Sequence, residues 1–243
     1  MTSITHPAIP RSTATAASEK SASRGLGALL IADALLSFAP VAVLGAAIGW
    51  PASLNNPASE QLAAIHANAA MVALGYGLYL LYSVLVAPVM IGMAAKVFGG
   101  LHRPAAATVA AFGASSALAR AIGILRWLTV MPALAAAHGA AGPEQRAQIE
   151  LVLNAITSYG GGIGEVLGVA LFMALSLGTL CIAALRGGGT PRWLASLGLA
   201  STVLLAGLLL PVFGGAELVP VAAAVSVLSM WMLAAGAWAL RRG

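Results

Sequence analysis

The stretch Gly161–Leu185, GGIGEVLGVALFMALSLGTLCIAAL, decides the class of this protein. Glu165 is its one ionised side chain in 25 residues. A helix needs about 20 apolar residues to cross the roughly 30 Å hydrocarbon core of a bilayer, and this stretch is longer than that. Because backbone groups in lipid must be hydrogen-bonded within the segment, we predict that it is a membrane-spanning helix.

Five further segments share this apolar character. The chain is 60% hydrophobic and 8% charged, with a mean hydropathy of +0.94, whereas a soluble domain carries about 25% charged residues. The composition therefore predicts an all-α, polytopic membrane helical bundle of six transmembrane helices. The predicted spans are Gly25–Trp50, Ala70–Val97, Ala105–Met131, Gly161–Leu185, Trp193–Phe213 and Leu218–Leu240.

The charges outside these spans alternate in sign. The N-terminal segment, the second and fourth loops and the C-terminus hold nine Lys or Arg residues against Glu19, and the other loops hold Arg146 against four Glu residues. The positive-inside rule then predicts that both termini are cytoplasmic. The net charge of +5 is on this interpretation a topology signal, so we predict contact with membrane lipids and no nucleic-acid partner.

Two kinds of segment flank the predicted spans. Residues 1–23 are rich in Ser, Thr, Ala and Pro without an apolar period, which predicts a disordered cytoplasmic tail ahead of a bundle over residues 24–243. Asn56-Pro57 and Gly142-Pro143 each place a proline in a helical first turn, and apolar residues follow both at helical spacing. We predict short amphipathic helices there, on or near the outer surface.

Four charged residues fall at least one helical turn inside the ends of the predicted spans, where a charge is costly and marks a buried pair or a functional site. Asp33, Arg120, Arg126 and Glu165 balance to zero. Arg120 shares a helix face with small residues, and glycines recur every fourth residue around Glu165, a pattern that lets two helices approach closely. The residues of these two faces are Gly113, Ser116, Gly123 and Trp127 with Arg120, and Gly160, Gly164 and Gly168.

Two interpretations of these charges remain open. In the first, Arg126 pairs with Glu165 and Arg120 with Asp33, and the structural ion pairs lock the spans together. In the second, a polar cavity open to the outside binds or moves a small amphipathic or anionic ligand, because arginine suits carboxylate and phosphate groups. The candidate ligand-binding residues are Arg126, Glu165, Trp127, Arg120, Tyr76, Tyr159 and Asn154.

A membrane-embedded enzyme that uses Glu165 is a third hypothesis. The sequence contains no catalytic serine, zinc-protease or paired-aspartate motif, so we predict no catalytic residues. Cys181 is the one cysteine, and the four histidines have no metal-ligand spacing, so neither a metal site nor a cofactor is expected. The oligomeric state is not indicated.

Two motifs carry a resemblance to a known family. They are Ala121–Trp127 (AIGILRW), followed by Val130–Leu134 (VMPAL), and Gly162–Gly168 (GIGEVLG). With Trp50-Pro51 and Gly75–Tyr79, they resemble a family of bacterial multi-span membrane proteins catalogued as a domain of unknown function. The resemblance covers residues from about 25 to 240. It implies six spans in a bacterial cytoplasmic (inner) membrane and supplies no activity.

Overall fold

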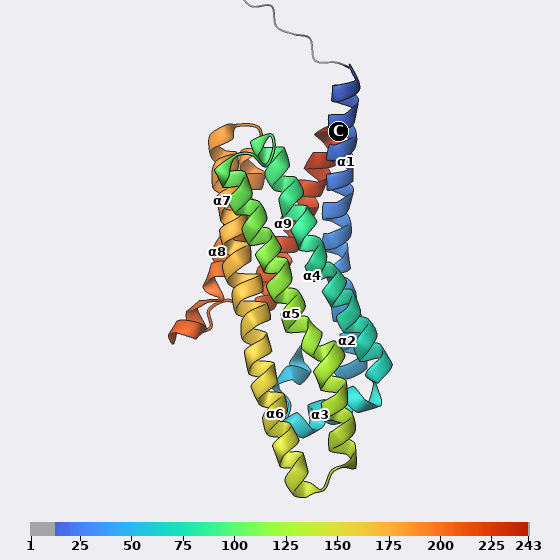
Figure 1. Cartoon of the computed structure of the whole chain (residues 1–243). Coiled ribbons are helices and arrows are strands. Elements are labelled where there is room, and N and C mark those ends of the chain that lie inside the picture. Colours follow the sequence, from blue (N-terminus) through green and yellow to red (C-terminus); the bar gives the residue numbers. More distant parts are fainter. Residues whose placement is uncertain (1–12, 243) are drawn as a thin grey trace, which may run out of the picture.

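The computed structural model describes residues 13–242 as a bundle of long helices with no strand in that range (Figure 1). Short 3-10 turns (η1 and η3) join some of the helices, and one segment (η2) is a π-helix. The elements in order are α1 (Thr13–Leu36), α2 (Phe38–Ile48), η1 (Ala52–Asn55), α3 (Ala58–Ala67), α4 (Ala69–Phe98), α5 (Pro104–Ala140), α6 (Pro143–Gly161), η2 (Gly162–Phe172), α7 (Met173–Gly187), α8 (Arg192–Gly207), η3 (Leu210–Phe213) and α9 (Val221–Arg242).

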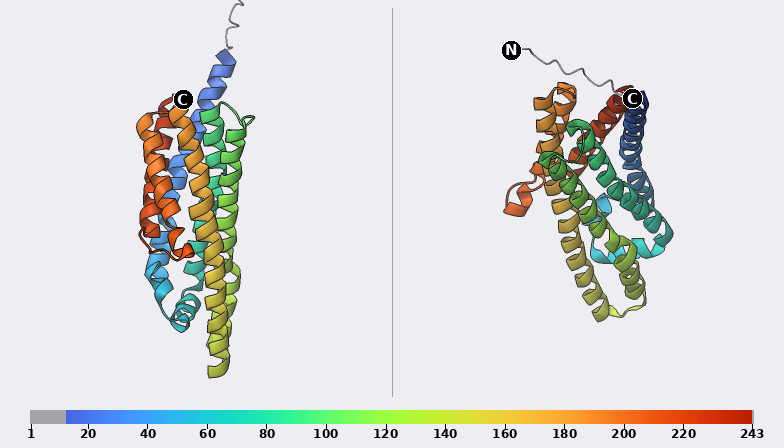
Figure 2. Two further views of the ribbon diagram at one scale, coloured as in Figure 1. Left: turned by 90° about the vertical axis from the view of Figure 1, so that its left-hand side faces the viewer. Right: turned by 45° about the horizontal axis from the view of Figure 1, so that its top comes forward.

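Six helical stretches are long and apolar enough to cross a membrane, which confirms the predicted multi-span helical bundle. They are Lys20–Ile48, Ala69–Phe98, Pro104–Ala140, Pro143–Gly187, Arg192–Phe213 and Val221–Arg242. With an even number of spans, α1 begins and α9 ends at the same end of the bundle (Figures 1 and 2). That this end is cytoplasmic stays a prediction from the charge pattern.

Two predicted segments differ from what the structure shows. Residues 13–23 belong to α1, where the sequence predicts a disordered tail; alanine-rich sequence favours helix, and residues 1–12 lie outside the described part. The predicted surface helix at Pro143 is α6, which continues through η2 into α7 as one stretch to Gly187. Gly162 keeps helical backbone angles there (φ −54°, ψ −44°), so the glycines do not break the helix.

This continuity makes one end of the molecule protrude. The stretch Pro143–Gly187 has 45 residues against 22 in α9, which correspond to about 65 Å and about 33 Å of helix. The α5–α6 hairpin consequently reaches far beyond the ends of α8 and α9 (Figures 1 and 2). At its tip, His138 Nε2 lies 2.9 Å from Glu150 Oε1, and Arg146 Nε donates to the carbonyl of His138 at 3.1 Å.

The buried apolar residues form two clusters. The larger joins α1, α4, α5, α7, α8 and α9 around side chains such as Leu30, Met90, Leu177 and Trp231. The smaller joins α2–α6 toward the protruding end and includes Leu44, Ile65, Tyr76, Trp127 and Leu153. Helices α4 and α5 contribute to both clusters and connect them.

Candidate ligand-binding site

Helix α5 and the π-helix η2 meet through glycine. A Cβ atom at Gly123 would lie 2.7 Å from Gly164 Cα and 2.9 Å from the carbonyl oxygen of Gly160. No side chain fits in that space, so the two backbones touch. Beside this contact, Ser116 Oγ donates to the carbonyl of Gly168 at 2.7 Å. The predicted close approach of the two small-residue faces is therefore present.

The flanking glycines leave room for the two arginines. A Cβ atom at Gly160 would lie 2.5 Å from Arg126 Nη1, and one at Gly168 would lie 2.8 Å from Arg120 Cγ. Each arginine side chain therefore passes over the place where a larger residue of the opposite helix would stand. The glycine spacing therefore leaves room for the Arg126 guanidinium and for the aliphatic part of Arg120 along the interface between α5 and α6–η2.

The segment that carries Glu165 is a π-helix of 11 residues, Gly162–Phe172. Most π-helical segments are single turns, and they occur frequently at functional sites. Glu165, Gly164 and Gly168 all lie within it. Within this π-helix, the carbonyl of Gly168 accepts a hydrogen bond from Ser116 on α5. Part of the backbone hydrogen bonding of the π-helix therefore comes from the neighbouring helix.

Next to this contact lies a cavity of about 410 Å³, a size typical of small-molecule sites. The segment between α2 and α3 contributes Trp50 and Leu54, α4 contributes two tyrosines, and the remaining lining comes from α5 and α6–η2. The lining residues are Trp50, Leu54, Tyr76, Tyr79, Arg120, Gly123, Ile124, Arg126, Trp127, Thr157, Ser158, Gly160, Gly161, Gly162, Gly164, Glu165, Val166 and Val169.

Several buried donors in this cavity have no hydrogen-bond partner among the described residues. Arg120 is 2% exposed and donates from Nη1 to Tyr82 Oη at 3.3 Å, and its Nε and Nη2 atoms are unpartnered. Arg126 donates from Nη1 to the carbonyl of Gly123 at 2.7 Å, and its Nε is unpartnered. The hydroxyl of Tyr76 is also unpartnered. A buried polar group without a partner costs about 1–3 kcal/mol.

Aromatic rings hold these groups in place. Tyr76 stacks on Trp127 with ring centroids 4.7 Å apart and planes within 6°. The Arg126 guanidinium carbon lies 5.5 Å from the Trp127 ring, and that of Arg120 lies 5.7 Å from the Tyr82 ring. Rings at these distances stabilise a cation through their π-faces. The cavity therefore has an aromatic wall that carries Arg126, while Tyr82, outside the lining, holds Arg120.

Neither Arg126 and Glu165 nor Arg120 and Asp33, the ion pairs of the first interpretation, lie within 4.0 Å of each other in the described structure. The one side-chain ion pair within 4.0 Å among the described residues is His138–Glu150, at the tip of the α5–α6 hairpin. Asp33 is wholly buried, and neither of its oxygens has a partner. The physical reason is that Arg126 uses a backbone carbonyl of its own helix, while Arg120 is directed toward Tyr82 on α4.

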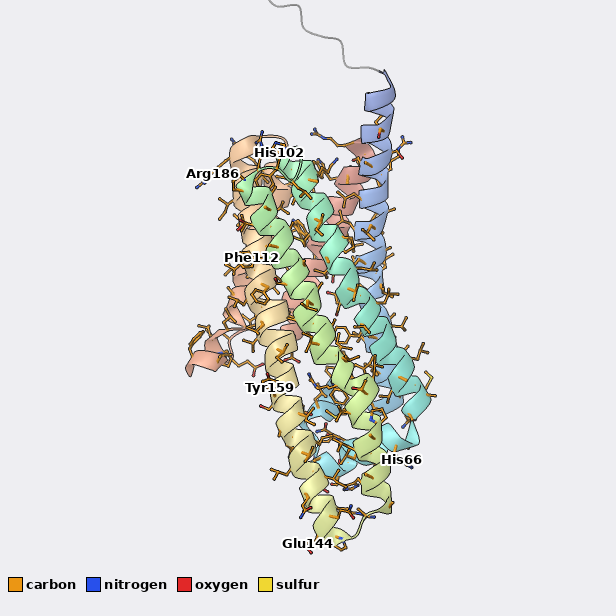
Figure 3. All side chains as sticks on the ribbon, in the orientation of Figure 1. His66, His102, Phe112, Glu144, Tyr159 and Arg186 are labelled. Carbon is orange, nitrogen blue, oxygen red and sulfur yellow. The ribbon has the colours of Figure 1, made fainter. Side chains whose placement is uncertain are left out.

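The structure brings five of the seven candidate residues to one cavity, namely Arg120, Arg126, Glu165, Trp127 and Tyr76. Tyr159 and Asn154 are exposed and do not line it. Tyr159, labelled in Figure 3, is 76% exposed because its neighbour Gly160 is the residue that packs on Arg126. Sequence reasoning left out Trp50, Leu54 and Tyr79. Tyr79 follows Tyr76 by three residues on one helix face, a spacing that packing against a neighbouring helix explains equally well.

Comparison with known proteins identifies the family of this chain. A family model described as Domain of unknown function (DUF4386) matches residues 26–240. No curated protein and no solved structure matches the chain.

Proposed function

Because this chain belongs to the DUF4386 family, whose description names no activity, we propose its function from the cavity. It is an integral membrane protein that binds a small amphipathic or anionic ligand between α4, α5 and η2. We place it in a bacterial cytoplasmic membrane with the cavity on the outward side, since the alternation of loop charges favours that orientation.

The unpartnered guanidinium N–H groups are the observation that carries this proposal. Arg120 and Arg126 line the same cavity and together leave three side-chain nitrogens without acceptors among the described residues. Charge-assisted hydrogen bonds to carboxylate or phosphate are the strong ones, and arginine makes them in pairs. An anionic group in the cavity would satisfy donors that the protein leaves unpaired.

The rest of the lining suits an apolar tail. Trp50, Ile124, Trp127 and Val169 present carbon surface to the same space as the guanidinium groups. Burying apolar surface contributes about 25 cal/mol per Å². A ligand with one anionic head and a short hydrocarbon chain therefore matches both parts of the wall.

The proposal is tested with octyl phosphate as a probe and octanol as its uncharged match. Purified full-length protein in maltoside detergent is titrated with each, and the thermal unfolding midpoint is followed. Stabilisation grows as RT ln(1 + [L]/Kd), by about 2.7 kcal/mol at a hundredfold excess over Kd. Octyl phosphate should raise the midpoint, and octanol should have little effect.

Arg126→Gln should weaken octyl phosphate binding by about 10- to 100-fold, since a charge-assisted hydrogen bond contributes about 1.5–3 kcal/mol. Arg103→Gln, an exposed position before α5, is the control and should bind as the unaltered protein does. Equal shifts with octanol, or equal losses in the two variants, would contradict the proposed site. That result would leave a structural or accessory subunit as the better description.

A further inference from the structure

A second cavity, of about 240 Å³, lies at the other end of the bundle. It is formed where α4, α7 and α9 end, at the end where the described chain begins and finishes (Figure 1). Arg186 and His102, labelled in Figure 3, mark this end. The lining residues are Lys96, Val97, Ala183, Ala184, Gly187, Gly189, Thr190, Trp238 and Arg242.

Two cations meet at one indole ring in this cavity. Lys96 Nζ lies 5.0 Å from the centroid of the Trp238 ring, and Arg242 Cζ lies 5.8 Å from the same centroid. Like charges that share one small space repel each other, so a shared ring alone does not explain the arrangement. An anion between them would relieve the repulsion.

The geometry around Lys96 is fixed by hydrogen bonds. Lys96 Nζ donates to Ser23 Oγ at 2.6 Å, and Ser23 Oγ donates to the carbonyl of Ala239 at 2.8 Å. These two hydrogen bonds connect α1, α4 and α9 and hold the Lys96 ammonium group at the cavity. An ammonium group has three N–H donors, and this bond uses one. The indole N–H of Trp238 is buried and has no partner in the described part of the chain.

The described side chains supply no counter-charge. No carboxylate among them lies within 4.0 Å of Lys96 or Arg242, and none lines the cavity. The charge pattern of the sequence assigns nine basic residues to this end of the bundle and one acidic residue, Glu19.

A simpler account is that these cations only stabilise helix ends. Lys96 and Arg242 lie in the last turns of α4 and α9, where a cation offsets the negative end of the helix dipole. Arg186 and Arg241 occupy equivalent positions on α7 and α9 without lining the cavity. Last-turn position therefore does not account for the convergence of Lys96, Arg242 and Trp238 on one cavity.

We propose that this cavity binds the phosphate of an anionic phospholipid headgroup from the adjoining leaflet. Lys96, Arg242 and the Trp238 N–H donate to the phosphate oxygens, and the apolar side chains Val97, Ala183 and Ala184 contact the start of the acyl region. Basic pockets between membrane helices are suited to such headgroups, and tryptophan favours this depth in a bilayer. The site is separate from the ligand cavity and does not depend on its function.

The test measures lipid selectivity in the full-length protein. Nanodiscs of phosphatidylcholine with increasing phosphatidylglycerol are prepared, the protein is extracted with a mild detergent, and retained lipids are counted by native mass spectrometry. Lys96→Gln and Arg242→Gln should each lower the preference for phosphatidylglycerol about fivefold, and the double variant about twenty-fivefold. Arg241→Gln, the neighbouring cation outside the cavity, should keep the preference.

One more variant and two soluble phosphate probes are added to the measurement of lipid selectivity. Glu19→Gln should keep or strengthen the preference, since it removes the acidic charge assigned to this end. Inorganic phosphate and glycerol 3-phosphate are added to delipidated protein to test a soluble source; binding as strong as that of the lipid would overturn the lipid assignment. Arg241→Gln losing as much as Arg242→Gln would overturn the site itself. If Lys96→Gln does not fold, Arg242→Gln at the chain end still decides the question.

Discussion

Two neighbouring parts of the α5–η2 interface are built in opposite ways. At Gly123 and Gly164 the backbones touch and no side chain fits between them. One helical turn to either side, Arg120 and Arg126 face a cavity of about 410 Å³ with unpartnered N–H groups. The closest contact between the two helices therefore carries no charge, and the two guanidinium groups lie beside the cavity.

This difference bears on why the arginines are there. If the spans were held together by ion pairs, the charges would be paired at the closest contact. Instead the glycines make the closest contact, and the nearest described acceptors of the arginines are a backbone carbonyl and a tyrosine hydroxyl. Replacing a whole buried ion pair by well-packed neutral side chains is often neutral or stabilising, so buried charges are weak evidence for a role in helix association. We infer that the arginines serve a ligand rather than helix association.

The largest expected effect is a loss of stability at the contact between Gly123 and Gly164. Gly123→Ala would place a Cβ atom 2.7 Å from Gly164 Cα, a backbone atom that cannot turn aside. The free energy of unfolding should fall by about 2–3 kcal/mol. Gly162→Ala is the control, because nothing lies within 4 Å of its Cβ position. Unfolding by sodium dodecyl sulfate in mixed micelles measures both, and equal stabilities would mean that the glycine contact is not close-packed.

On the cavity side, Glu165→Gln should act in the opposite direction to Arg126→Gln. Glu165 lines the same cavity and would repel an anionic ligand. Removing its charge should tighten octyl phosphate binding about fivefold, which corresponds to about 1 kcal/mol, the interaction of two unit charges about 4 Å apart at the dielectric constant of water. Isothermal titration calorimetry gives the affinity. Weaker binding in Glu165→Gln would indicate a ligand that also carries a positive group.

Tyr76→Phe separates the hydroxyl from the ring. Because the hydroxyl has no partner among the described residues, its loss should leave the stability of the free protein unchanged. The phenylalanine ring keeps the stack on Trp127. Octyl phosphate affinity should fall about threefold or more, because a net hydrogen bond contributes at least about 0.5–1.5 kcal/mol. A drop in stability without ligand would show that the hydroxyl is bonded within the protein.

The smallest effect is expected at the tip of the α5–α6 hairpin, away from both the glycine contact and the cavity. His138→Gln breaks the ion pair with Glu150. A side-chain hydrogen bond contributes about 0.5–1.5 kcal/mol, so stability should fall by about 0.5 kcal/mol and octyl phosphate binding should not change. Glu144→Gln, at an exposed position in the first turn of α6, is the matched control. A change in binding would connect the tip with the cavity.

The fold was predictable because its signals are long and local. Six apolar runs and the four-residue spacing of Gly160, Gly164 and Gly168 require no knowledge of side-chain directions. The hydrogen-bond partner of Arg126 was not predictable, because it depends on which acceptor a flexible side chain reaches, and in the structure Arg126 donates to the carbonyl of Gly123. Tyr159 was misplaced for a similar reason. Its orientation follows from the neighbouring glycine packing on α5.

The double variant Arg126→Gln, Glu165→Gln tests most directly whether the charges serve the ligand or the packing. Its thermal unfolding midpoint is compared with that of the unaltered protein, without and with octyl phosphate. We predict that the midpoint without the probe is unchanged or higher, and that the stabilisation by the probe is reduced. A lower midpoint without the probe, with the stabilisation by octyl phosphate retained, would contradict this account and show that the charges hold the helices together.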